Sequence, residues 1–165
     1  MTWDAYHRRN DALREVAAAA DQRRDGVLPW GEYGTSEVFD SRDDLLLALH
    51  MRWHNRLRAY VHAELDDEPV DLEAAAARAW RYATADLPGT RAILDAHQAN
   101  PALAGARAKE LAFLAQAAGL VPGDGGAVAL GERVKSRGEA IVLDRQRPTR
   151  RRPRRLRRLR QAIAA

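Results

Sequence analysis

Two histidines with helical spacing are the first residues that could do chemistry. His50 and His54 lie four residues apart in "LLLALHMRWHNRLRAYVHAEL". Residues at this spacing face the same side of a helix, where two imidazoles can reach one metal ion. Both histidines also fall inside the apolar sector of that helix, whereas His62 lies at its edge. The apolar sector comprises Leu46, Leu49, Trp53, Leu57, Tyr60 and Val61.

Two interpretations of His50 and His54 are open. In the first, they bind a metal or act as general acid and base. Candidates for a third metal ligand on other helices are His7, His97, Asp4 and Asp95. In the second, which we favour, each neutral ring packs in the core and uses one nitrogen to bond a neighbouring group. The segment lacks the glutamate of an H-E-x-x-H motif, and the chain lacks the Glu-x-x-His pair of a di-iron bundle, so we predict no metal and no cofactor.

The second candidate for chemistry is the arginine-rich segment "RPTRRRPRRLRRLR", residues 147–160. Guanidinium groups pair bidentately with phosphate oxygens, so this segment predicts binding to nucleic acid. No aromatic residue is interleaved with the arginines to stack on bases, and we expect contact with the phosphate backbone without sequence preference. The predicted contact residues are Arg147, Arg150, Arg151, Arg152, Arg154, Arg155, Arg157, Arg158 and Arg160.

Charge divides the chain into two parts. Residues 145–165 carry ten arginines and no acid, whereas residues 1–144 carry 17 basic and 23 acidic side chains. We therefore predict an acidic helical bundle over 1–144 and an arginine-rich tail over 145–165. Pro148 and Pro153 keep the start of the tail extended, and its end can form a basic amphipathic helix. Two alternatives are that the tail docks on an acidic protein surface, the body included, and that it reflects composition alone, because the chain has 25 arginines and only two lysines.

Capping signals and apolar periodicity predict the elements that position these residues. Ser41, Asp71 and Asn100 each precede a run of helical periodicity, and Gly119 ends the third of these runs. The predicted helices cover 3–24, 41–65, 71–86, a short stretch around Ile93, 100–118 and about 130–144. Residues 25–40 form a loop that is apolar enough to lie against the body. The fold class is therefore an all-α, single-domain bundle of five to six helices with a basic C-terminal tail.

Several classes of function are excluded by what the sequence lacks. There is no cysteine, no P-loop, no dinucleotide fingerprint and no nucleophile elbow. No stretch approaches the roughly 20 apolar residues of a membrane span, and we expect a cytoplasmic protein. We expect a non-catalytic binding or regulatory module anchored to nucleic acid by its tail. The alternatives are a metal-dependent or acid/base helical-bundle enzyme using His50 and His54, and a protein–protein interaction module. A homo-oligomer formed through the alanine-rich stripe of residues 72–83 stays open.

Overall fold

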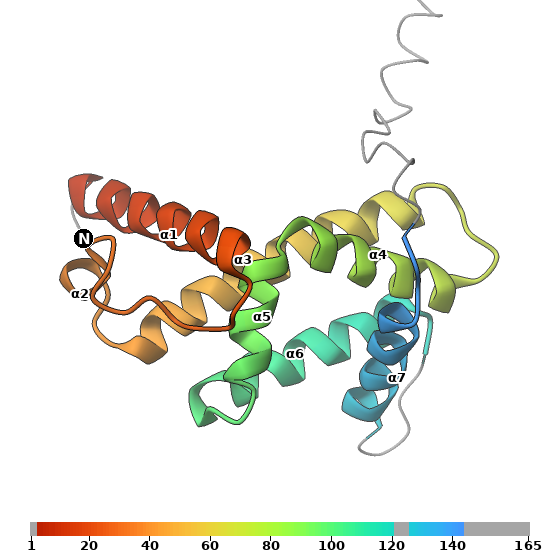
Figure 1. The fold of residues 1–165 in the computed structure, drawn as a ribbon. Coiled ribbons are helices and arrows are strands. Elements are labelled where there is room, and N and C mark those ends of the chain that lie inside the picture. Colours follow the sequence, from red (N-terminus) through yellow and green to blue (C-terminus); the bar gives the residue numbers. More distant parts are fainter. Residues whose placement is uncertain (1–2, 121–125, 144–165) are drawn as a thin grey trace, which may run out of the picture.

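The computed structural model describes residues 3–120 and 126–143, and every regular element in these ranges is a helix (Figure 1). The seven helices are α1 Trp3–Arg23, α2 Thr35–Val38, α3 Arg42–Leu65, α4 Leu72–Asp86, α5 Pro88–Ala96, α6 Pro101–Ala117 and α7 Ala127–Glu139. The predicted all-α class is confirmed. The described part contains seven helices, whereas five to six were predicted. The additional helix is α2, a single turn within the predicted loop. None of the helices in the described ranges is long and apolar enough to cross a membrane.

The residues predicted to cap helices do so in the structure. The side chains of Ser41, Asp71 and Asn100 each accept a hydrogen bond from a backbone N–H of the helix that follows, at 3.1, 2.7 and 2.9 Å. Gly119 has a φ of +68°. The N–H of Leu120 then reaches back to the carbonyl of Ala115 at 3.0 Å, which completes the Schellman turn at the end of α6.

α3 is the central helix of the arrangement and contacts α1, α4, α5 and α6. In Figure 1, α1 and α2 lie at one end of the molecule, and α4 and α7 lie at the other. α5 lies in the middle and runs crosswise to the line that joins the two ends. Trp53, at the middle of α3, is fully buried and packs edge-on against Trp80 of α4, with ring centroids 6.2 Å apart. A single hydrophobic cluster extends from Val16 of α1 to Val134 of α7.

The loop between α1 and α3 lies against the body, as its apolar residues predict. Phe39 is 3% exposed, and Leu28 and Trp30 pack against the core. Arg9 of α1 holds this loop: its guanidinium lies 4.2 Å from the centre of the Phe39 ring and makes two hydrogen bonds to Asp44, at 2.7 and 2.8 Å. This bidentate pair holds the pKa of Asp44 below its ordinary value.

Two glycines allow α7 to pack closely against its neighbours. The same glycines disfavour a helix when the sequence is considered alone. Gly131 and Gly138 are buried. A Cβ atom on Gly131 would lie 2.1 Å from the carbonyl oxygen of Leu111, and one on Gly138 would lie 2.8 Å from that of Ala77. The glycines therefore allow α7 to approach the backbones of α6 and α4. The helix ends at Glu139 rather than near 144 as predicted.

Gly131→Ala should lower the free energy of unfolding by about 2–3 kcal/mol, because the new methyl group collides with a backbone atom that cannot rotate away. Gly105→Ala in α6 is the matched control. Nothing lies within 4 Å of its Cβ position, so the higher helix propensity of alanine should stabilise this variant by about 0.5–1 kcal/mol. Urea denaturation followed by circular dichroism measures both. Equal stability of the two variants would contradict the packing described for α7.

Candidate functional site

Three polar side chains from three helices meet in the core. His50 of α3, Arg91 of α5 and Glu110 of α6 are 6%, 6% and 4% exposed, and we refer to them as the polar cluster. The Nε2 atom of His50 lies 2.9 Å from Oε2 of Glu110, and Nη1 of Arg91 lies 3.5 Å from Oε1. Arg91 also donates from Nη2 to Asp95, at 2.7 Å. The cluster thus ties α3, α5 and α6 together through one carboxylate.

The helical register explains why these residues are buried. Glu110 comes seven residues after Leu103 and four residues before Leu114, and it therefore lies on the same face of α6 as these two core residues. Arg91 comes four residues after Leu87, which precedes α5, and three residues before Leu94 of α5, so it also lies on the buried face of its helix. Helical spacing predicts His50 as a candidate, whereas Arg91 and Glu110 are not among the residues predicted from the sequence. A charged residue within an apolar stripe was the signal that could have found them.

Charge complementarity keeps Glu110 ionised in the core. Burial opposes ionisation, but the hydrogen bond from His50 and the charge of Arg91 outweigh it, so the pKa of Glu110 lies below its ordinary value. The guanidinium of Arg91 lies 4.9 Å from the centre of the Trp53 ring, which adds a cation–π contact. The arrangement has the features of a buried ion pair that fixes the packing of helices.

His54 occupies a different environment from His50. Its ring lies parallel to that of His50, with centroids 6.2 Å apart, and it meets the Phe113 ring edge-on at 5.4 Å. Its Nδ1 atom is buried and has no hydrogen-bond partner. Burial lowers the pKa of His54, and the nearby His50 and Arg58 lower it further against the opposing effect of Glu110.

Within the described ranges, no three histidine or acidic side chains lie close enough to hold a metal ion together. His97 donates from Nδ1 to the carbonyl of Ile93 at 2.9 Å, and His7 packs against the Trp3 ring at 4.3 Å. Asp95 joins the polar cluster only through Arg91. His50 and His54 therefore lie side by side on α3, but the structure brings none of the suggested third ligands to both.

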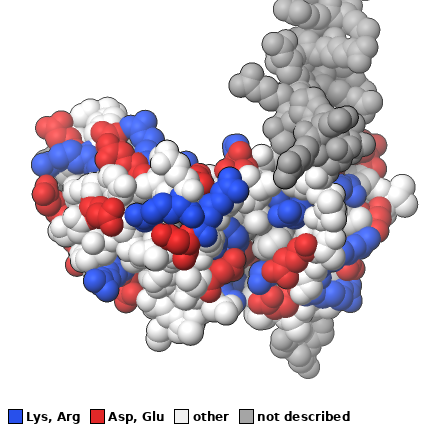
Figure 2. All heavy atoms as spheres, in the orientation of Figure 1, with Lys and Arg blue, Asp and Glu red and all other residues white. Residues whose placement is uncertain are grey.

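The nine arginines predicted to contact nucleic acid lie outside the described residues. They are Arg147, Arg150, Arg151, Arg152, Arg154, Arg155, Arg157, Arg158 and Arg160. The described residues carry 17 basic and 21 acidic side chains and therefore a net charge of −4. Figure 2 shows that the two signs are interspersed over the face of the body turned to the viewer.

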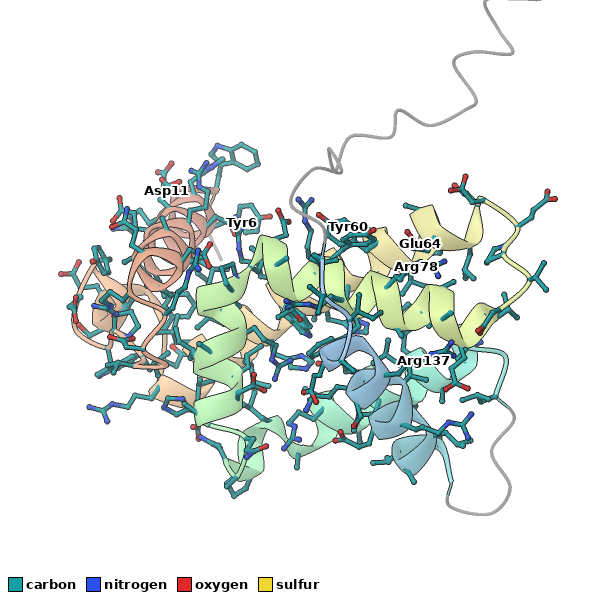
Figure 3. All side chains as sticks on the ribbon, turned by 45° about the vertical axis from the view of Figure 1, so that its right-hand side comes forward. Tyr6, Asp11, Tyr60, Glu64, Arg78 and Arg137 are labelled. Atoms are coloured by element: carbon teal, nitrogen blue, oxygen red, sulfur yellow. The ribbon has the colours of Figure 1, made fainter. Side chains whose placement is uncertain are left out.

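Many charged residues of the body pair with one another. The clearest contacts between helices are Arg78–Glu64, Arg133–Glu73 and Arg137–Asp71, at 2.8, 2.6 and 2.8 Å, together with Arg56–Asp86. Figure 3 shows Glu64 of α3 beside Arg78 of α4. Arg56 thus joins α3 to α4 through Asp86.

The fold and the cluster define an all-helical body with a buried histidine–carboxylate–guanidinium contact. No family model, no curated protein and no solved structure matches the chain. The site is therefore interpreted from its own geometry.

Glu110→Gln should lower the free energy of unfolding by about 3 kcal/mol, because it removes the buried negative charge that His50 and Arg91 share and leaves Arg91 with only the exposed Asp95. Glu132→Gln is the control, since this glutamate is half-exposed and its ion pairs are long, and its change should stay within about 0.5 kcal/mol. Denaturant unfolding measures both. If the charge is responsible, adding Arg91→Met to Glu110→Gln should cost less than the sum of the two single changes.

His54 should make the protein less stable as the pH falls from about 7 to 5. Its pKa in the folded protein lies below the ordinary 6.5, so the unfolded chain binds the proton first, and stability is lost once the pH passes below 6.5. The slope from this group cannot exceed about 1.4 kcal/mol per pH unit. His54→Gln should flatten the pH dependence of the unfolding free energy in this range. A slope identical to that of the unaltered chain would refute this assignment.

Proposed function

We propose that the chain is a non-catalytic binding module whose helical body carries an arginine-rich segment that anchors it to the phosphate backbone of nucleic acid. The observation that carries the proposal is the separation of charge. Ten arginines and no acid stand in residues 145–165, and the rest of the chain is acidic. The expected contacts are with phosphate groups, so the binding has no sequence preference.

The charges of the body support this proposal over docking of the segment on the body itself. The bidentate and short ion pairs described above occupy body carboxylates with body arginines. Residues 1–144 have an excess of six acids over basic residues, against ten arginines in residues 145–165, which leaves the whole chain with a net charge of +4. A cationic excess therefore stays available for an external polyanion.

The polar cluster does not favour an enzyme. His50 and Glu110 are hydrogen-bonded in the manner of a catalytic pair, but they are only 6% and 4% exposed, and their contact ties two helices together in the core. We assign them the role of fixing α3 on α6. A protein partner with an acidic surface is the second candidate for the arginine-rich segment, and the experiment below separates it from nucleic acid.

Replacing the nine arginines of residues 147–160 with glutamine in the full chain should weaken binding to nucleic acid at least tenfold. Labelled duplex and single strand are titrated at several salt concentrations. If about six phosphates are neutralised, the unaltered chain should show a log–log slope of affinity against salt of about −5 on duplex, and the variant a slope near zero. Both nucleic acids should bind whatever their base sequence.

A chain in which the order of residues 147–160 is shuffled serves as the matched control, because it keeps length and charge. It should bind as the unaltered chain does if the contact is with phosphates alone. Unchanged affinity in the glutamine variant would overturn the proposal. Loss of binding in the shuffled chain would point instead to a partner that recognises an ordered segment, as a protein surface does.

A further inference from the structure

A small pocket opens between α5, α6 and α7, next to the polar cluster. It is lined by Arg91, Arg107, Glu110, Leu111, Glu132 and Lys135, and with the Glu132 side chain in its present place it has room for about one water molecule. α6 and α7 are in extensive contact, and the side of the molecule formed by α7 comes forward in Figure 3. Three of the six lining residues are cations from three different helices.

The two carboxylates of the pocket differ in how firmly they are held. Glu110 is buried and bonded to His50 at 2.9 Å. The carboxylate of Glu132 lies 3.8 Å from the guanidinium of Arg107 and 3.8 Å from the ammonium of Lys135, which is beyond hydrogen-bond distance. Its side chain is 41% exposed, so it can turn into solvent without losing a hydrogen bond to either cation.

Arg91, one of the residues that line the pocket, carries an unsatisfied donor. Its side chain is 8% exposed, and its Nη2 group binds Asp95. Its Nη1 group reaches Glu110 only at 3.5 Å, and its Nε–H is buried without a hydrogen-bond partner. A buried donor of this kind is rare in folded proteins and gains free energy from any acceptor placed beside it.

We propose that this pocket binds a small tetrahedral oxyanion, as free phosphate or as a phosphomonoester, which takes the place of the Glu132 carboxylate between Arg107 and Lys135. The Glu132 carboxylate lies within 3.8 Å of both cations, while Arg107 also donates to the carbonyl of Gln98 at 2.7 Å and Lys135 lies 3.4 Å from the carboxylate of Glu139. Arg91 also lines the pocket, and guanidinium groups are suited to the oxygens of phosphate. The lining residues retain a positive charge once Glu132 has turned outward.

The first test follows the side-chain Nε–Hε resonances of the arginines by NMR while inorganic phosphate is added to the full chain. The resonance of Arg91 should move and then saturate. Ribose 5-phosphate in place of phosphate shows whether the pocket also accepts a monoester. The titration is repeated on the full chain with glutamine at the nine arginines of residues 147–160, where binding by that segment cannot contribute.

Substitutions then locate the anion. Lys135→Gln should weaken phosphate binding about tenfold, because a charge-assisted contact is lost. Glu132→Gln should strengthen it by a similar factor, because the competing carboxylate is gone. Lys109→Gln is the matched control on the exposed face of α6 and should change the affinity less than twofold.

Equal affinities of the Lys135→Gln and Lys109→Gln chains would overturn the proposal, as would an Arg91 resonance that stays in place at saturation. An affinity that falls with Glu132→Gln would do the same. Failure here is distinguishable from failure of the nucleic-acid proposal. The glutamine chain tests the pocket without the arginines of residues 147–160, and the pocket variants keep all of those arginines.

Discussion

Glu110 places a negative charge in the core between α3, α5 and α6, and the described body is arranged so that this charge is matched. His50 and Arg91 reach it from the two other helices. The desolvation of three polar side chains is costly, and it is offset by their mutual contacts together with those of Arg91 to Asp95 and Trp53. Any sliding or rotation of α6 against α3 or α5 would separate the partners, whereas apolar contacts alone tolerate small shifts. The cluster therefore selects one register of these helices.

Close approach of helices is the second constraint, and it complements the first. Gly89 lies where a Cβ atom would come within 2.0 Å of the backbone of Ala20, and Gly131 is placed in the same way against Leu111. Gly89 also donates its N–H to the carboxylate of Asp21 at 2.8 Å, so α1 caps the first turn of α5. Close backbone contact between α1 and α5 thus adds to the side-chain packing that joins this end of the molecule to the central helices.

Local chemistry was predictable from the sequence, and non-local chemistry was not. Ser41, Asn100 and Gly119 act within a few residues of their own position, so their roles in beginning and ending helices could be predicted. Gly131 lowers helix propensity, and Glu110 places a charge within an apolar stripe, so neither is favourable when its own helix is considered alone. The stability that each contributes depends on a neighbour that is distant in the sequence. Both are departures from helical patterning that mark a contact between helices. The pairing of His50 with Glu110, sixty residues away, could not be derived from spacing on one helix.

The packing of α7 against α4 and α6 has a mechanical consequence. The arginine-rich segment follows this helix in the chain, so a load applied there reaches the body through residues 141–143. Arg81 of α4 donates to the carbonyl of Ile141 at 2.9 Å. This bond lies just after the end of α7, whose glycines pack closely against α6 and α4. The N–H of Ile141 also donates to the carbonyl of Gly138 at 3.1 Å, and the Ile141 side chain packs against the core. Tension would strain these contacts first and would then act on α7, which is packed against α4 and α6. The contacts of Ile141 are thus weaker than the packing of α7 on α4 and α6. They would break first, and the helical core would stay assembled.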